Sequence, residues 1–131
     1  MARILVLDDV ADAGRMVREI LHRKGHEVHV FSDEDDALRF AATHPIDMAI
    51  LDMKLRKMEG TEVLAELRKR NPDLAVIMLT GFPTKTAAGQ AMALGALAYC
   101  AKPIDKQELE RIVATAFLPS QEKHAADCPN D

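Results

Sequence analysis

The chain has 131 residues, 48% of them hydrophobic and 29% charged, which is the composition of one globular domain. Its formal net charge of −4 argues against nucleic acid as a direct partner, because binding a phosphate backbone requires a basic face. No apolar run approaches the roughly 20 residues that span a membrane, and Asp8 and Asp9 follow the apolar start too early for a secretory signal. A cytoplasmic protein without membrane contact is expected, with Cys100 and Cys128 as reduced thiols.

The first half of the chain alternates short apolar runs with segments that carry apolar residues at helical spacing. In chain order, these predict a strand at 3–7, a helix at 11–24, a strand at 27–31, a helix at 32–42 and a strand at 46–51. Ser32, with Asp35 three residues later, resembles an N-terminal helix cap.

The second half repeats the alternation. A polar loop at 52–59 precedes a predicted helix at 60–70, a strand at 74–79, a helix at 84–94, a strand at 96–100 and a helix at 105–118. Asp105 and Glu108 form a second candidate capping pair, and Pro119 ends the last helix.

Strand–helix alternation repeated five times predicts an α/β fold with a parallel sheet and helices on both faces. Because crossovers are right-handed, few arrangements remain, and we expect the flavodoxin-like strand order 2-1-3-4-5. One domain is predicted over residues 1–118, and the polar tail at 119–131 is expected to be disordered.

Polar residues follow four of the predicted strands, at the edge where open parallel sheets bind ligands. Asp8 and Asp9 follow the first strand, Asp52 the third, Thr80 the fourth and Lys102 the fifth. Each alone has an ordinary explanation as a helix cap, a loop acid or a turn residue, but their joint placement favours a site.

Three carboxylates that converge repel one another, and a divalent cation relieves that repulsion. Mg²⁺ (or Mn²⁺) prefers oxygen ligands together with a phosphate oxygen, and a carboxylate can itself accept a phosphoryl group. The pattern therefore favours metal-dependent formation of an aspartyl phosphate.

At this point the sequence resembles a known family, the response-regulator receiver domains of two-component signalling. The match comprises Asp8-Asp9, Asp52 with Gly60 after it, Thr80-Gly81, and Tyr99 before Lys102-Pro103. It covers residues 3–118, nearly the whole chain.

The resemblance implies that Asp52 is the phosphoacceptor. It also implies that Asp9 and Asp52 ligate Mg²⁺ directly, together with the backbone carbonyl of Lys54, whereas Asp8 acts mainly through a bound water. Lys102 then pairs with Asp52 or with the phosphoryl group.

The resemblance also implies a switch. Thr80 is expected to hydrogen-bond the phosphoryl group, and Tyr99 to change rotamer on the surface formed by the last two helices and the strand between them. The Lys102–Pro103 peptide bond is expected to be cis.

Two further positions are expected to set the lifetime of the phosphorylated state. Lys54 and Phe82 stand two residues after Asp52 and Thr80, where their side chains would border the path of the hydrolytic water. The chain departs from the family at Arg56, where members commonly have Pro, and the basic pair Arg56-Lys57 predicts a more mobile loop.

As partners, the resemblance implies a sensor histidine kinase or a histidine phosphotransfer protein, and a downstream target protein. No output module is recognisable, which favours a stand-alone receiver; the alternative is the receiver part of a longer regulator. The chain is expected to catalyse only its own phosphorylation and dephosphorylation.

Two other functions stay open. A Mg²⁺-dependent phosphohydrolase of the haloacid dehalogenase type needs an Asp-x-Asp pattern that the adjacent Asp8-Asp9 pair does not match. A phosphate-independent binding module on the same fold would not need the complete set of acidic, Thr and Lys positions. A flavin-binding protein is disfavoured, because no phosphate-binding loop follows the first strand.

Overall fold

The structure, a computed structural model, describes residues 2–117. Its strands are β1 (Arg3–Leu7), β2 (Glu27–Phe31), β3 (Met48–Asp52), β4 (Ala75–Thr80) and β5 (Ala98–Ala101). Its helices are α1 (Ala11–His22), α2 (Glu34–Thr43), α3 (Gly60–Arg70), α4 (Lys85–Ala93) and α5 (Lys106–Ala116). The predicted alternation of strands and helices is confirmed.

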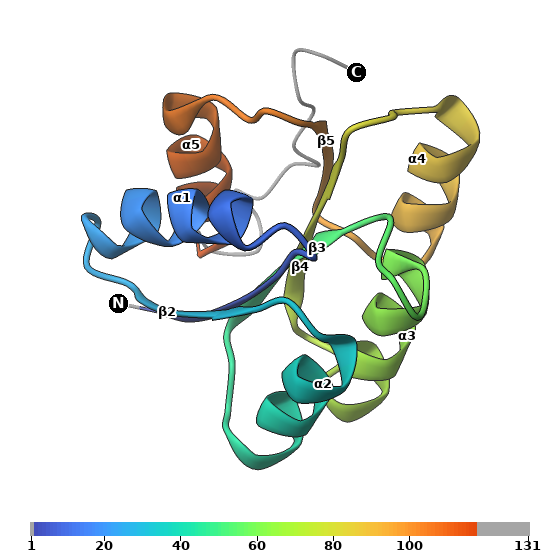
Figure 1. Cartoon of the computed structure of the whole chain (residues 1–131), viewed down its shortest axis with the longest axis horizontal. Helices are drawn as coiled ribbons and strands as arrows, with labels where there is room; N and C mark the ends of the chain where they lie inside the picture. The colour runs from blue at the N-terminus through green and yellow to red at the C-terminus, as the bar shows by residue number, and fades with distance from the viewer. Residues whose placement is uncertain (1, 118–131) are drawn as a thin grey trace.

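The five strands form one parallel sheet in the order β2-β1-β3-β4-β5. Helices α1 and α5 cover one face of this sheet, and α2, α3 and α4 cover the other (Figure 1). The predicted α/β class, the flavodoxin-like order and the placement of helices on both faces are therefore confirmed.

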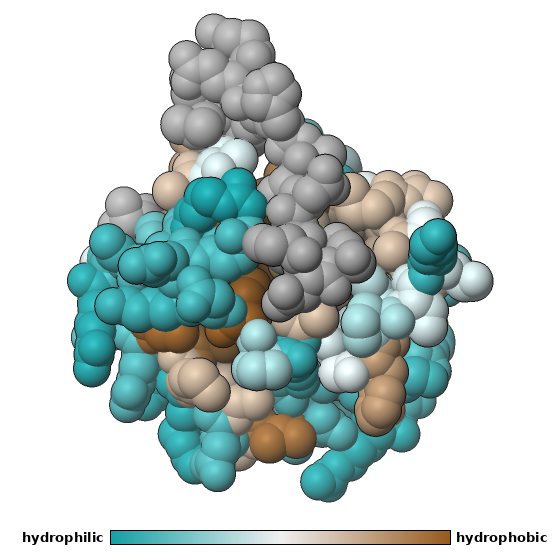
Figure 2. Space-filling view, turned by 90° about the horizontal axis from the view of Figure 1, so that it is seen from above, coloured by the Kyte–Doolittle hydropathy of each residue, from teal (hydrophilic) through white to brown (hydrophobic). Residues whose placement is uncertain are grey.

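Burial on both faces explains why the strands read as continuous apolar runs. In β1, Ile4 and Val6 join the core beneath α1 and α5, whereas Leu5 and Leu7 join the core beneath α2, α3 and α4. Figure 2 shows a surface on which hydrophilic residues predominate and apolar residues form separate patches. Within residues 2–117, no helix combines the length and the apolar character needed to cross a membrane.

The helix starts differ in part from the prediction. The N-cap of α2 is Asp33, one residue after the expected Ser32, and its side chain does not cap the helix. Asp105 does cap α5, since its carboxylate accepts hydrogen bonds from the backbone N–H groups of Gln107 and Glu108 at 3.0 and 3.2 Å.

The prediction of reduced thiols is wrong for Cys100, which is buried in β5 and disulfide-bonded. That prediction rested on the rarity of disulfides in cytoplasmic proteins, which says nothing about which side chains lie close together in this fold. Cys128 and the tail at 119–131, which was expected to be disordered, lie outside the described residues.

Candidate functional site

The register of the sheet brings the predicted polar residues to one edge. Leu7 pairs with Leu51, so Asp8 and Asp52 stand level at the carboxyl ends of β1 and β3. Thr80 ends β4 and pairs with Ala101, the last residue of β5, so Lys102 follows immediately after that strand. Parallel strands thus turn positions far apart in the sequence into neighbours.

Three carboxylates form the centre of the site. Asp8, Asp9 and Asp52 each offer an oxygen, and these oxygens all lie within 4.8 Å of one another. Asp8 and Asp52 are only 5% and 6% exposed, while Asp9 is half-buried. Charged groups with so little solvent are costly unless they are paired.

Lys102 supplies part of that pairing. Its Nζ donates hydrogen bonds to Asp8 Oδ2 at 2.7 Å and to Asp52 Oδ2 at 3.0 Å. Its backbone N–H donates to the Thr80 carbonyl at 2.7 Å, and the Lys102–Pro103 bond is cis, as expected. One ammonium against three carboxylates leaves negative charge uncompensated, and this oxygen-rich donor set suits Mg²⁺.

Burial changes the protonation equilibria at this centre. It raises the pKa of Asp52 above its usual value, although the hydrogen bonds from Lys102 and from the Lys54 backbone act in the opposite direction. Burial also acts to lower the pKa of Lys102, but the hydrogen bonds to Asp8 and Asp52 outweigh it and the pKa is raised. Lys102 therefore stays protonated as the fixed cation of the site.

Gly60, eight positions after Asp52, lies where any side chain would collide with the Asp52 backbone. A Cβ on Gly60 would lie 2.1 Å from the Asp52 carbonyl oxygen and 2.9 Å from Met53 Cα, so no other residue fits without a backbone shift. The Gly60 N–H donates to the Met53 carbonyl at 2.8 Å. The first turn of α3 is thus packed directly against the backbone of Asp52.

Thr80 and Tyr99 act on the segment that leads from β4 to α4. Thr80, 2% exposed, accepts a hydrogen bond from the Phe82 N–H at 3.1 Å, which leaves its hydroxyl hydrogen available to donate. Tyr99 is also buried, and its hydroxyl accepts from the Thr84 N–H at 3.1 Å. The two predicted switch residues therefore hold two points of the same short segment.

Comparison with known proteins identifies this arrangement. The sequence profile of the response regulator receiver domain matches residues 4–114, which is most of the chain. The chain belongs to this family. Receiver domains of two-component response regulators are modules of phosphorylation-based signalling, and this chain is such a domain.

Individual relatives agree with the family. The regulatory protein AtoC of Escherichia coli is 34% identical over 123 residues, which make up 92% of this chain but 26% of AtoC. A CheY-like receiver domain protein from Methanospirillum hungatei is 31% identical with a TM-score of 0.83, over 88% of this chain and 94% of that one.

A response regulator from Burkholderia pseudomallei, whose crystal structure contains a phosphorylated aspartic acid, a calcium ion and citrate, is 29% identical. It matches with a TM-score of 0.80 over 93% of this chain and 69% of its own. The chain spans about a quarter to a half of the length of the first curated relatives that it matches.

In this receiver domain, the two residues expected to set the lifetime flank the site with exposed side chains. Phe82 is 81% exposed in the segment before α4. The Lys54 side chain is 73% exposed, and its Nζ lies 3.9 Å from Glu59 Oε1. The backbone of Lys54 is closer to the chemistry, because its N–H donates to Asp52 Oδ1 at 3.2 Å.

Sequence reasoning missed Glu34, at the start of α2. This side chain is 1% exposed, and its Oε2 accepts hydrogen bonds from the backbone N–H groups of Lys57 and Met58. In the sequence it reads as one member of an acidic first turn, so no local signal marks it. The prediction of a mobile loop from Arg56-Lys57 omitted this partner, which restrains the loop.

Proposed function

We propose that this receiver domain accepts a phosphoryl group on Asp52 in a Mg²⁺-dependent reaction and passes the resulting change to a target protein. The observation that carries the proposal is the cluster of Asp8, Asp9 and Asp52, of which Asp8 and Asp52 are buried and share the Lys102 ammonium. The donor would be a sensor histidine kinase or a histidine phosphotransfer protein. We expect the reaction to take place in the cytoplasm.

The chemistry at the acceptor is an in-line displacement. An oxygen of Asp52 forms a bond to the phosphorus of a phosphohistidine, the P–N bond breaks, and its electron pair returns to the imidazole nitrogen. Such transfers depend on positioning and on compensation of charge more than on covalent chemistry by the protein. A buried, oriented carboxylate meets the first requirement, and the cations meet the second.

The metal, when bound, supplies positive charge to the phosphoryl oxygens. Asp9, Asp52 and the Lys54 carbonyl would hold it directly, and Asp8 would hold it through a water. Lys102 would then pair with a phosphoryl oxygen, since its Nζ already lies 3.0 Å from Asp52 Oδ2.

Transmission to the surface would begin at Thr80. If its hydroxyl turns to donate to a phosphoryl oxygen, its hydrogen bond with the Phe82 N–H changes. Tyr99 holds the same segment at Thr84, so a shift of the segment alters the environment of Tyr99 on the surface of α4, β5 and α5. The phosphorylated aspartic acid and the calcium ion in the Burkholderia pseudomallei relative support the proposed phosphorylation of Asp52 beside a cation.

Intact mass after incubation with acetyl phosphate and Mg²⁺ tests the proposal. We expect one added phosphoryl group, lost in acid and absent when a chelator removes the metal, and Asp52→Asn should abolish it. Asp73→Asn, which changes an exposed acid elsewhere, is the matched control and should label like wild type. Equal labelling of the Asp52→Asn variant would overturn the assignment, and repeated turnover of a phosphoester would instead indicate a phosphohydrolase.

A further inference from the structure

Glu34 lies outside the set of residues that the proposed reaction uses, yet it is buried like one of them. Within residues 2–117, the buried acidic residues are Asp8, Asp52 and Glu34. The first two belong to the acceptor site. A carboxylate that is 1% exposed is retained only where it makes hydrogen bonds that compensate for the loss of water.

Both hydrogen bonds of Glu34 go to the loop between β3 and α3. Its Oε2 accepts from the Lys57 N–H and, at 3.1 Å, from the Met58 N–H. Around it, Lys57 Nζ forms ion pairs with Asp33 at 2.8 Å and with Asp35 at 2.9 Å. The start of α2 therefore holds the loop in two ways, by hydrogen bonds to the loop backbone and by ion pairs to the Lys57 side chain.

The base of this loop is fixed in another way. Lys54 and Glu59 form an isolated antiparallel bridge, and the Gly60 N–H donates to the Met53 carbonyl. The tip at 55–58 lies beyond that bridge, where Leu55 and Met58 pack against the core. Apolar packing holds the tip against the protein but does not fix backbone direction, whereas two hydrogen bonds to one carboxylate oxygen do.

We propose that Glu34 is a positioning residue for the metal site. By holding the loop tip, it fixes the backbone on both sides of the bridge and so presents the Lys54 carbonyl in the orientation that Mg²⁺ requires. Arg56 removes the restraint that a Pro would give at that position, and Glu34 supplies a restraint from another element. This inference rests on the proposed function, in which the Lys54 carbonyl is a metal ligand.

The test compares Glu34→Ala, Glu34→Gln and Lys57→Ala in the full chain. Glu34→Ala leaves the Lys57 and Met58 N–H groups without their acceptor. It should raise the Mg²⁺ concentration for half-maximal labelling by roughly tenfold, as loss of outer-shell partners does, with the rate at saturating Mg²⁺ unchanged. Glu34→Gln keeps a neutral acceptor and should restore most of the affinity. Lys57→Ala removes only exposed ion pairs and should behave like wild type.

Amide hydrogen exchange without metal gives a second readout, independent of activity. In Glu34→Ala, the Lys57 and Met58 amides should exchange faster than in wild type, while the amides of α5 should be unchanged. The inference is overturned if half-saturation stays within about twofold of wild type, or if these two amides remain protected. If Glu34→Ala does not fold, Glu34→Gln decides, and it should show a smaller rise, about threefold, in the half-saturating concentration.

The two hypotheses fail differently. Absence of labelling or of Mg²⁺ binding in the wild-type protein would refute the proposed function. Normal labelling of wild type, with the same Mg²⁺ dependence in Glu34→Ala, would refute the role of Glu34 alone.

Discussion

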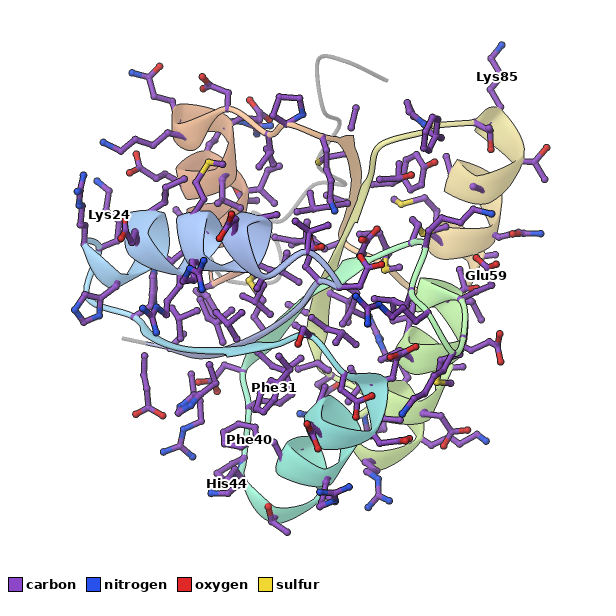
Figure 3. All side chains as sticks on the ribbon, in the orientation of Figure 1. Lys24, Phe31, Phe40, His44, Glu59 and Lys85 are labelled. Carbon is purple, nitrogen blue, oxygen red and sulfur yellow. The ribbon has the colours of Figure 1, made fainter. Side chains whose placement is uncertain are left out.

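Two loops border the same acidic centre, and they are held very differently. The loop from β3 to α3 is held at its base by the Gly60 N–H and the Lys54–Glu59 bridge, and at its tip by Glu34. In the segment from β4 to α4, residues 81–84 are all exposed, and Thr80 and Tyr99 each accept one hydrogen bond from it. Figure 3 shows Glu59 and Lys85 near the points where the two loops enter α3 and α4.

This difference matches two tasks that the proposed function assigns to one site. A metal ligand set has to be ready before the phosphoryl group arrives, which requires a loop whose backbone is fixed. A signal requires a segment whose hydrogen bonds can be exchanged at low cost, and such segments have few buried contacts. On the proposed function, the receiver domain would separate the two tasks by placing them after neighbouring strands, β3 and β4.

The largest effect is expected at the fixed loop, from Gly60→Ala. The added Cβ would meet the Asp52 carbonyl oxygen at 2.1 Å, so the backbone of Asp52 has to move. We expect a loss of about 1–3 kcal/mol in the free energy of unfolding and weaker labelling of Asp52, measured by urea denaturation and by intact mass.

Gly89→Ala is the matched control for that substitution. Gly89 lies within α4, and a Cβ there would meet nothing within 4 Å. Alanine at this position should stabilise the protein by about 0.5–1 kcal/mol, because glycine weakens a helix interior. Equal effects of the two substitutions would show that the close approach at Gly60 does not matter.

The sequence predicted some features of these two loops and of the site between them, but not others. Strand periodicity placed Asp8, Asp52, Thr80 and Lys102 at one edge, because parallel strands all end there and each residue follows its own apolar run. The Lys102–Pro103 cis bond followed from the family resemblance. The start of α2 was predicted one residue early, since Ser32 and Asp33 are both good caps and only the fold distinguishes them.

Glu34 could not be predicted from any local pattern. Its partners lie 23 and 24 residues away in the sequence, and they are backbone groups, which every residue carries. The disulfide at Cys100 was missed for a similar reason, because composition does not report on contacts. The sequence pattern therefore identifies the side chains that carry chemistry, but not the long-range contacts that hold the backbone around them.

A smaller effect is expected from Tyr99→Phe. It acts on residues 81–84 between β4 and α4, here called the exchangeable segment because its hydrogen bonds would be exchanged on phosphorylation. The Thr84 N–H loses its 3.1 Å acceptor, but water can replace it at this exposed position, so stability should fall by only about 0.5–1.5 kcal/mol. Labelling of Asp52 should be unchanged. In amide spectra, phosphorylation should still shift Phe82, whereas the shift at Thr84 should shrink. Undiminished shifts at Thr84 would show that Tyr99 is not coupled to Thr80 through this segment.

The smallest effects are expected on the decay rate of the phosphorylated form, when one exposed side chain in each loop is removed. Phe82 and Lys54 flank the site, and both would border the approach of the water that hydrolyses an aspartyl phosphate in line with the leaving oxygen. Phe82 cannot orient water and can exclude it, whereas Lys54 can hold a phosphoryl oxygen if it leaves Glu59. Because both side chains are so exposed, we expect Phe82→Ala and Lys54→Ala to speed decay by only about threefold, or roughly 0.7 kcal/mol of barrier.

Decay of the phosphorylated form after donor removal, in excess Mg²⁺, measures this lifetime. Phe117→Ala is the control, since Phe117 is also exposed but follows α5 and lies beside His26, which precedes β2 at the opposite edge of the sheet. Its decay should equal that of wild type. Rates within about twofold of wild type for both Phe82→Ala and Lys54→Ala, a change of only ~0.4 kcal/mol, would place control of the lifetime elsewhere. An effect at Phe82 alone would assign it to the exchangeable segment, and so extend the division between the two loops to the decay of the signal.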